Sequence, residues 1–270
     1  MKAISIHLSK QIARFTAALR KLRLRWFKKS LGTSAETSAE TSAETSSSQG
    51  QHLVFNNTGK QLYKKSTRLF TIILTCEKYR YKMLSQDTTM LGDYMYFIGD
   101  PKLPYPLVKG DIVYLPCPDN YESLPIKTLM AIEWAVENKE FDLILKTDDD
   151  VSFFGNFNKI VCDASEYDYS GRIITAGADD WHFGKCENEE LNSTIVDVPE
   201  GEYCEGPAYF LSKKSASYLA GRGVRDNYFI YEDAEVGYLL RKIGIIGTML
   251  RVNEGFVVLD ESGVAMWPPN

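Results

Sequence analysis

One segment restricts the possible folds more than any other: a nearly unbroken apolar run that ends in three consecutive aspartates. The run Phe141–Leu145 reads Phe-Asp-Leu-Ile-Leu, and it is followed directly by Lys146-Thr147-Asp148-Asp149-Asp150. A strand this apolar is typical of the centre of a parallel sheet that is covered on both faces. The sequence therefore predicts a layered core with an acidic cluster at the end of a buried strand.

Other strand-like runs, rich in β-branched and aromatic residues, alternate with helical patterns from residue 70 onward. We expect strands over Phe70–Cys76, Tyr94–Ile98, Asp111–Leu115, Phe141–Thr147, Arg172–Ala176, Tyr209–Ser212 and Glu254–Leu259. We expect helices over Ser123–Asn138, Lys213–Ala220 and Glu232–Ile243. Strands that alternate with helices indicate an α/β fold with a central, mostly parallel sheet.

Charge and composition divide the chain into a basic head, a spacer and an acidic body. Residues 1–32 hold nine Lys and Arg and no acidic residue, whereas residues 49–270 hold 22 basic and 33 acidic side chains. Residues 33–50 contain three copies of Thr-Ser-Ala-Glu, which has nothing to bury and is expected to be a solvated linker. About 200 residues suffice for one full domain, predicted here over residues 51–270. The acidic body argues against nucleic acid as a partner.

Apolar residues of the head recur at steps of three and four, so they share one helical face: Ile4, Leu8, Ile12, Phe15, Leu19, Leu22 and Trp26. A basic amphipathic helix over residues 1–32 suits an anionic membrane interface, and we expect peripheral membrane contact through it. A transit peptide and docking onto the acidic body are alternatives. No stretch reaches the ~18–20 apolar residues of a membrane span, and no secretory signal is recognisable, so membrane-associated and cytoplasmic locations both stay open.

The five cysteines form no Cys-x-x-Cys pair, so no zinc or redox motif is indicated. Cys76, Cys117 and Cys162 lie in or beside apolar segments and are expected to be buried thiols. Cys186 and Cys204 lie in loops and could form a bridge in an oxidising compartment, but reduced thiols are the expectation.

The aspartate run is the strongest local signal for chemistry. Ligands of open α/β sheets bind at the carboxyl ends of strands, which is where Asp148, Asp149 and Asp150 are predicted to lie. Adjacent carboxylates repel one another unless a cation relieves them, and hard oxygen ligands suit magnesium or manganese. The alternative is a simple acidic loop, which the apolar strand before it disfavours.

Two further segments carry candidate functional residues. Glu232, Asp233 and Glu235 open a predicted helix, where either catalysis or favourable interaction with the helix dipole explains them. The segment Trp181–Cys186 mixes aromatics with His182 and Lys185 around a glycine, which is typical either of a substrate-facing loop or of a packed aromatic corner.

Four motifs occur in order along the body: Tyr-x-x-Leu-x-x-Lys-Thr at Tyr121–Thr128, Lys-x-Asp-Asp-Asp at Lys146–Asp150, Tyr-Cys-x-Gly-x-x-Tyr-x-Leu-Ser at Tyr203–Ser212, and a Glu-Asp segment at Glu232–Gly237. In this order and spacing, the chain from about Phe70 to Phe256 resembles the β-1,3-glycosyltransferases of glycosyltransferase family 31, the galactosyltransferase and Fringe-like group. Each motif is modest alone, whereas four in sequence are fairly specific.

The resemblance implies a GT-A fold, a nucleotide-sugar-binding α/β sandwich, over residues 51–270. It also implies metal-dependent, inverting transfer of a hexose from a UDP-sugar to a glycan or glycoprotein hydroxyl, with a β-1,3 link. Asp148 and Asp150 are expected to hold Mn²⁺ or Mg²⁺ as a DxD motif, and Asp233 is expected to be the catalytic base. Residues expected to bind the substrate or the donor are Lys127, Asp148, Asp149, Trp181, His182, Lys185, Gly206 and Glu232.

The sequence departs from the family pattern in three places. No histidine follows the Glu-Asp segment, the usual glycine-rich run reads Gly206-Pro207-Ala208, and the basic head stands where a transmembrane anchor is usual. A sugar- or nucleotide-binding protein that has lost catalysis is therefore the alternative function. A metal-dependent phosphotransferase or phosphatase is disfavoured, because Val151 and Ser152 follow Asp150 and no Asp-x-Asp-x-Thr pattern appears.

Overall fold

The computed structural model describes residues 53–55, 61–63, 67–175, 181–198, 200–222, 230–252, 255–260 and 264–267. The chain divides into two compact units, one of Met1–Ser66 with Arg225–Asn227 and one of Thr67–Val224 with Tyr228–Asn270. In the first unit the described residues are strands β1 (Leu53–Phe55) and β2 (Gln61–Tyr63), which pair antiparallel. The predicted helix over 1–32 and linker over 33–50 lie outside the described residues, and the division into domains stays a prediction. Within the described part of the chain, no helix is long and apolar enough to cross a membrane.

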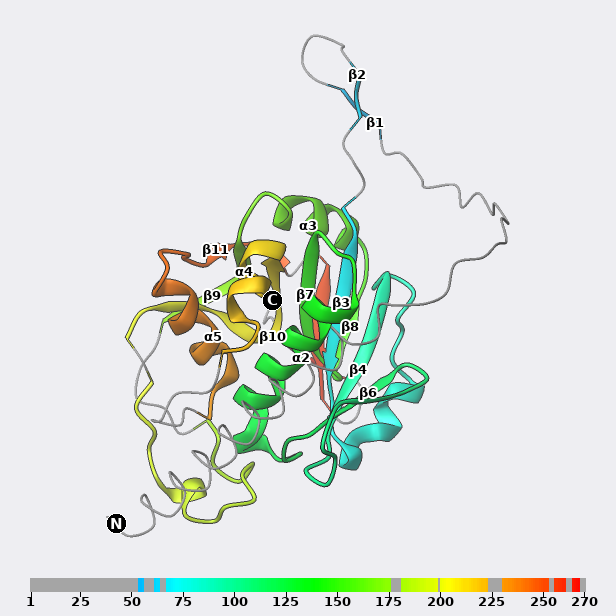
Figure 1. The fold of residues 1–270 in the computed structure, drawn as a ribbon. Helices are drawn as coiled ribbons and strands as arrows, with labels where there is room; N and C mark the ends of the chain where they lie inside the picture. Colours follow the sequence, from blue (N-terminus) through cyan, green and yellow to red (C-terminus); the bar gives the residue numbers. More distant parts are fainter. Residues whose placement is uncertain are drawn as a thin grey trace, which may run out of the picture. The chain divides into compact units, whose positions relative to one another are not determined.

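The second unit is built on an eight-stranded sheet with the order β11-β9-β10-β7-β3-β4-β6-β5 (Figure 1). The four central strands β7, β3, β4 and β6 run parallel, while β10 pairs antiparallel with both β7 and β9. The strands are β3 (Leu69–Leu74), β4 (Asp93–Gly99), β5 (Leu107–Lys109), β6 (Ile112–Leu115), β7 (Leu143–Asp148), β9 (Tyr169–Thr175), β10 (Glu202–Ser212) and β11 (Thr248–Met249). The predicted α/β class with a mostly parallel central sheet is confirmed.

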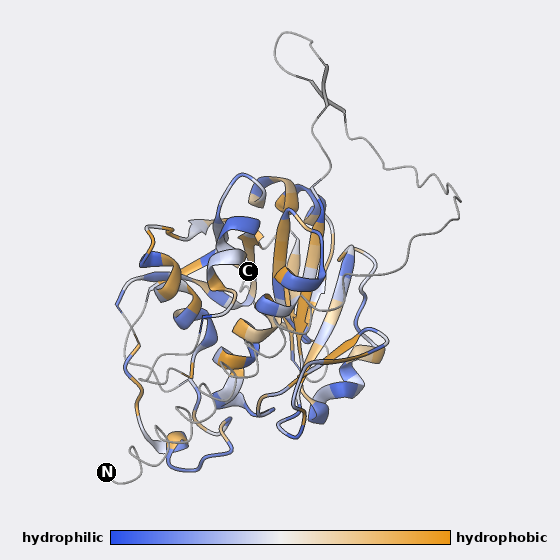
Figure 2. Cartoon of the chain, in the orientation of Figure 1, coloured by the Kyte–Doolittle hydropathy of each residue, from blue (hydrophilic) through white to orange (hydrophobic). Residues whose placement is uncertain are grey.

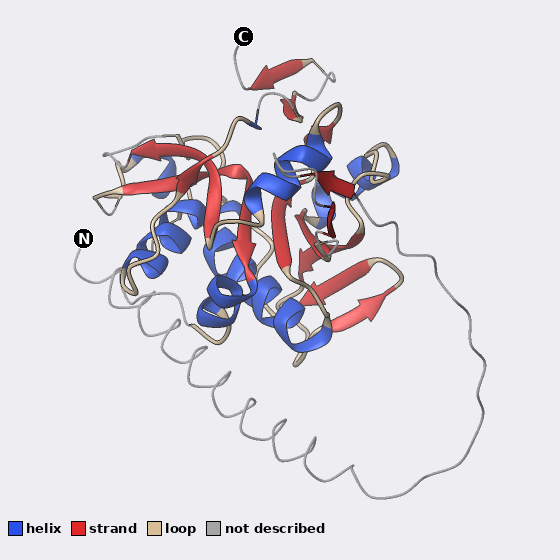
Figure 3. Ribbon diagram, turned by 90° about the horizontal axis from the view of Figure 1, so that it is seen from above, coloured by secondary structure: helices blue, strands red, loops and turns tan. Residues whose placement is uncertain are grey.

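Both faces of this sheet are covered, as the apolar run of β7 requires. Helices α2 (Leu124–Asn138), α4 (Lys213–Leu219) and α5 (Glu232–Arg241) pack on one face. Helix α3 (Phe157–Ala164) and a small sheet cover the other face; the small sheet contains β8 (Val151–Phe153), β12 (Phe256–Leu259) and β13 (Ala265–Trp267). Figures 2 and 3 show apolar residues concentrated in the central strands and helices arranged around them.

Most predicted elements are present with shifted ends, and several short ones were not predicted. Strand β10 begins seven residues before the predicted Tyr209, because it crosses an irregularity between Cys204 and Tyr209 that interrupts its apolar alternation. Helix α3 was not predicted, although its buried residues recur at helical spacing: Phe157, Ile160, Val161 and Ala164. Three 3₁₀ helices were also missed: η1 (Glu77–Leu84), η2 (Tyr121–Ser123) and η3 (Leu191–Ser193).

The cysteines differ in how deeply the structure buries them. All five cysteines are free, so Cys186 and Cys204 do not form a bridge. Cys117 is buried as predicted, whereas Cys76 is only partly buried and Cys162 is exposed, so the prediction is wrong for Cys162 and too strong for Cys76. Cys162 lies on α3, whose apolar face turns Ile160 and Val161 toward the sheet and leaves Cys162 toward solvent.

Candidate functional site

The carboxyl ends of β3 and β7 meet at one edge of the sheet and bring the aspartate run against the segment after β3. Leu74 lies opposite Asp148 in the parallel ladder. One residue further along β3, the Thr75 hydroxyl donates to Asp149 at 2.6 Å, and the Lys82 ammonium of η1 lies 3.4 Å from the same carboxylate. Asp149 is therefore held by partners from β3 and η1.

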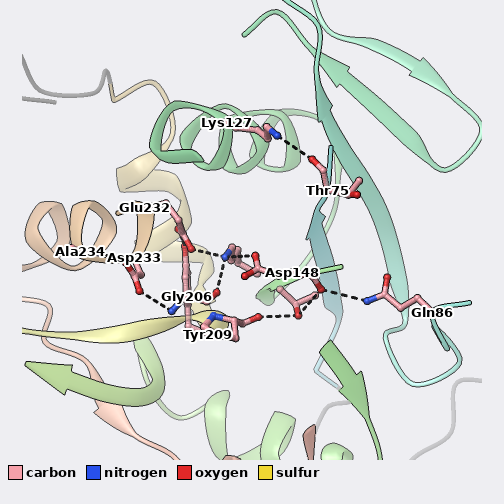
Figure 4. A network of polar contacts seen from close by, with 12 residues as sticks. Thr75, Gln86, Lys127, Asp148, Gly206, Tyr209, Glu232, Asp233 and Ala234 are labelled. Carbon is pink, nitrogen blue, oxygen red and sulfur yellow. Dashed lines mark hydrogen bonds and ion pairs between the residues drawn. The ribbon is translucent and has the colours of Figure 1, made fainter. Parts of the chain in front are cut away.

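The turn that carries the aspartates is fixed through its backbone. The side-chain amide of Gln86 donates to the carbonyls of Asp148 and Val151 at 3.4 and 3.3 Å. On the other side, the Leu259 amide of β12 donates to the Asp150 carbonyl at 2.9 Å. These contacts fix the backbone of the turn that carries the three aspartates, and Figure 4 shows Gln86 beside Asp148.

Lys146 lies at the centre of the site although its side chain is only 1% exposed. Side chains alternate across a strand, so Lys146 and Asp148 point to the same face of β7. The ammonium lies 2.8 Å from Asp148 Oδ1 and 2.5 Å from Glu232 Oε1, and it donates to the Gly206 carbonyl at 2.6 Å. One cation thus joins the aspartate run to β10 and to the first turn of α5.

Glu232 and Asp233 begin α5, and each is held by groups from β10. The Tyr209 hydroxyl donates to the second oxygen of Glu232 at 3.0 Å, and Tyr209 lies opposite Lys146 in the β10–β7 ladder. Asp233 Oδ2 accepts from the Gly206 amide at 2.8 Å, while its Oδ1 accepts from the Ala234 amide at 2.8 Å. Figure 4 shows Glu232 and Asp233 beside Gly206 and Tyr209, which lie in the middle of β10.

Gly206 is required by this close approach. It lies in the irregular part of β10, where the ladder to β9 shifts register, so its amide and carbonyl are free to bind side chains. A Cβ at this position would lie 3.2 Å from Asp233 Oδ2 and 3.4 Å from Glu232 Oε1. A side chain here would therefore push against both acids of α5.

The acids of the site are buried enough to hold protons near neutral pH. The pKa of Asp150 is raised to about 6, first by burial and then by the carboxylates of Asp148 and Asp149. Burial also raises the pKa of Asp233 to about 6, against the stabilising amides of Ala234 and Gly206. The pKa of Glu232 rises to about 7 with burial. Burial alone would lower the pKa of Lys146, but the carboxylates of Asp148 and Glu232 outweigh it and keep the ammonium charged.

Two residues that were predicted to bind the substrate or the donor are instead buried and bound to other parts of the protein: Lys127 and His182. Lys127 is 1% exposed, and its ammonium binds Asp119 Oδ1 at 2.6 Å and the Thr75 carbonyl at 3.0 Å. These contacts tie α2 to the loops after β3 and β6. Lys127 therefore supports the loops, and its charge is paired with Asp119 and not with the aspartate run.

His182 is likewise a supporting residue. It is fully buried, with Nδ1 2.6 Å from the Tyr231 hydroxyl and Nε2 2.8 and 3.0 Å from the carbonyls of Leu191 and Thr194. Since both ring nitrogens are engaged, the predicted substrate contact is corrected to an anchor inside the loop. Trp181 and Lys185 lie on the outside of the same loop, with the Lys185 ammonium 4.2 Å from the centre of the Trp181 ring.

The donor set fits a hard divalent cation, although protein ligands alone do not complete a site. In residues 67–175 and the other described segments, no group of three or more His, Cys, Asp and Glu side chains is arranged to hold a metal ion. Asp148 and Asp150 nevertheless offer carboxylate oxygens. The pKa of Asp150 is raised first by burial and then by the carboxylates of Asp148 and Asp149, whose negative charge a cation would relieve.

Sequence analysis missed four contributors to the site: Thr75, Lys82, Lys146 and Tyr209. For Lys146 a signal was present, because a lysine in the middle of an otherwise apolar strand must find buried acids or carbonyls. Tyr209 occupies a tyrosine position of the motif at Tyr203–Ser212, but its contact to Glu232 was not predicted. Thr75 and Lys82 had no such signal, since their partner Asp149 lies 74 and 67 residues away in the sequence.

Comparison with known proteins agrees with the order of the motifs. Residues 108–251, more than half of the chain, match the galactosyltransferase family model. Over 142 residues the chain is 30% identical to UDP-GalNAc:beta-1,3-N-acetylgalactosaminyltransferase 2 of Mus musculus, a match that covers 51% of this chain and 27% of the relative. The protein of the same name from Homo sapiens gives the same identity and coverage. The match spans about a quarter of the length of these curated relatives.

Solved structures give distant likenesses. A protein described as a glucose-1-phosphate thymidylyltransferase from Bacillus anthracis shows 15% identity and a TM-score of 0.39, covering 70% of this chain and 89% of its own. Protein A197 from STIV shows 11% identity and a TM-score of 0.41, covering 75% and 100%. Neither likeness bears on the role of any residue.

Proposed function

The chain belongs to the galactosyltransferase family, and from this premise we propose that it is a metal-dependent, inverting glycosyltransferase. In this proposal a hexose passes from a UDP-sugar to a hydroxyl of a glycan or glycoprotein and forms a β-1,3 link. The name of the mammalian relatives favours UDP-GalNAc as the first donor to test, and the family assignment adds UDP-galactose.

One observation carries the proposal: the buried ammonium of Lys146 holds the aspartate run and the acids of α5 within one cluster. Its contacts to Asp148 and Glu232 are 2.8 and 2.5 Å long, and Asp233 is the next residue after Glu232. A transferase of this kind needs a place for a diphosphate and a base close to each other, and the cluster offers both.

The division of labour follows from the chemistry of the reaction. The acceptor hydroxyl is a poor nucleophile until a carboxylate takes its proton, and we assign this role to Asp233. Asp233 Oδ2 is oriented by the Gly206 amide, and its raised pKa of about 6 suits a base that works near neutral pH. Attack from the face opposite the diphosphate inverts the anomeric carbon and needs no covalent intermediate.

Asp148 and Asp150 are the residues that would hold Mn²⁺ or Mg²⁺. Such a metal, when bound, stabilises the negative charge that develops on the departing diphosphate. Asp149 is already engaged by Thr75 and Lys82, so we assign to it the support of the turn and of the donor side. Lys146, which also binds Glu232, keeps Asp148 in place.

The test is a UDP-release assay over UDP-Gal, UDP-GlcNAc, UDP-Glc and UDP-GalNAc, with and without added Mn²⁺ or Mg²⁺. We expect release with at least one donor, dependence on the metal, and loss of more than about 100-fold in Asp150→Ala and Asp233→Asn. Folding of both variants is checked by circular dichroism. Wild-type turnover in both folded variants would overturn the assignment of the site.

A binding protein without catalysis is the second candidate. It is favoured by the absence of a histidine after the Glu-Asp segment and by the stiff Gly206-Pro207-Ala208 run. Calorimetry that shows UDP binding, together with no turnover for any donor and acceptor, would select it over the transferase.

A further inference from the structure

A loop beside the acids exposes large aromatic side chains to solvent. It comprises residues 181–198, and Trp181 is 67% exposed while Phe183 is 39% exposed. Exposed single aromatics are ordinary on protein surfaces, but these lie on one short loop together with a lysine. Two properties decide what this loop can bind: the contacts that hold it and the residues that it lies against.

Contacts inside the loop make it a fixed surface. The buried His182 binds the Tyr231 hydroxyl and two carbonyls across the loop. Asn192 forms a reciprocal pair with the Cys186 backbone, accepting from its amide at 3.0 Å and donating to its carbonyl at 2.9 Å. Glu122 also accepts from the amides of Glu187 and Asn188, at 3.2 and 3.1 Å.

The same contacts attach the loop to the helix that carries Asp233. A hydrophobic cluster joins the loop to the start of α5, with Tyr121 packed against it; its buried members are Cys186, Tyr203, Ile230, Tyr231 and Ala234. Tyr231 and Ala234 flank Glu232 and Asp233 in the sequence. The exposed aromatics are thus fixed relative to the acids of α5.

Lys185 extends between two aromatic rings. Its ammonium is 4.2 Å from the centre of the Trp181 ring and 5.6 Å from that of Tyr121. Tyr121 packs against the hydrophobic cluster that contains Tyr231 and Ala234, the residues on either side of Glu232 and Asp233. Lys185 therefore links the exposed Trp181 to Tyr121, which lies against the start of α5.

We propose that Trp181, Lys185 and Tyr121 form a binding surface for a pyranose ring of the acceptor. This inference rests on the proposed function, because a base must face the acceptor and the surface is fixed to the helix of the base. The apolar C–H face of a pyranose matches the part of the exposed indole that the Lys185 ammonium, 4.2 Å from the ring centre, does not cover, and this ammonium can donate hydrogen bonds to sugar hydroxyls. Of the substrate and donor contacts that the sequence predicts for Trp181 and Lys185, the proposal assigns them the acceptor.

The first arm of the test measures sugar binding without catalysis. Saturation-transfer NMR is recorded with the methyl β-glycosides of galactose, glucose, N-acetylglucosamine and N-acetylgalactosamine. We expect transfer to the ring C–H protons of at least one glycoside with the wild-type chain, most of it retained in Trp181→Phe and lost in Trp181→Ala. Tyr167→Ala is the matched control, because Tyr167 is a 42% exposed aromatic on the turn between α3 and β9.

The second arm measures kinetics with the best donor and acceptor. Trp181→Ala is expected to raise the KM for the acceptor by about tenfold or more, the cost of losing one aromatic anchor, and to change the KM for the donor by less than about twofold. Circular dichroism of each variant shows whether it is folded. No saturation transfer to any glycoside, or equal transfer in Trp181→Ala, overturns the surface.

The outcomes separate the inference from the function on which it rests. If sugar binding depends on Trp181 but no donor releases UDP, the sugar-binding surface is supported and the transferase function is contradicted. If UDP release needs Asp150 and Asp233 but Trp181→Ala leaves the KM for the acceptor unchanged, the transferase function is supported and the sugar-binding surface is contradicted.

Discussion

The cluster around Lys146 and the loop of residues 181–198 both combine charged and aromatic side chains, but they are built in opposite ways. Lys146 is buried and its partners lie 60 and 86 residues away, on β10 and α5. The loop is held mostly by its own short-range contacts, such as His182 to Leu191, nine residues apart, and Cys186 to Asn192, six residues apart. Its exposed residues can change without disturbing the sheet. A substitution in the cluster is therefore expected to change both stability and activity. A substitution of an exposed loop residue is expected to change substrate specificity with little change in stability.

The largest effect is expected from Lys146→Met. Removing the cation leaves Asp148 and Glu232 facing each other without compensation, which should cost about 3–5 kcal/mol in the free energy of unfolding. The measurement is a urea titration followed by circular dichroism. Lys214→Met is the matched control: Lys214 also lies 2.5 Å from a carboxylate, that of Asp168, but its side chain is 68% exposed, so the loss should stay below about 1 kcal/mol.

Equal losses in the two lysine variants would contradict this difference between buried and exposed pairs. Adding Glu232→Gln to Lys146→Met should recover part of the stability, because it removes one of the stranded charges. Transferase activity should not recover, since the first turn of α5 would still lack its link to Asp148.

An intermediate effect is expected inside the loop. His182→Ala leaves the Tyr231 hydroxyl and two carbonyls without their partner and should cost about 1–3 kcal/mol. Trp181→Ala, one residue away and exposed, should change the free energy of unfolding by less than about 0.5 kcal/mol. Thermal unfolding of the two variants in parallel measures this contrast. A Trp181→Ala loss as large as that of His182→Ala would mean that the indole stabilises the loop.

The smallest effect is expected from pH. The pKa of Asp233 is raised to about 6, so its base form is lost below that value and turnover should fall about tenfold for each further unit. Because the folded pKa lies above the unfolded value of 3.8, burial favours the protonated acid; this contribution to stability is present below pH 3.8 and lost as pH rises through 6. Sugar binding at Trp181, which does not titrate, should stay constant between pH 5 and 7, about the range in which turnover changes. A flat rate across this range would exclude Asp233 as the base.

Sequence patterns were sufficient for the layers of the fold and for the region of the site. The apolar run before Asp148 required a strand covered on both faces, and the structure has α2 on one face and α3 on the other. The patterns were not sufficient for the roles of His182 and Lys127. Both are polar residues in motif-like segments, and only their burial identified them as supports. Peripheral membrane contact through residues 1–32 remains a prediction.

By itself the sequence determined the main strands of the central sheet, which strand end is acidic, and the order of motifs that marks the family. These follow from periodicities of two and about 3.6 residues and from local spacing, which need no knowledge of strand order. The tertiary structure alone decided that Lys146 joins Asp148 to Glu232, that Gly206 binds Asp233, and that the exposed loop is fixed to α5. Those contacts depend on β10 pairing antiparallel with β7 and on α5 packing against β10, and no local pattern in the chain specifies either arrangement.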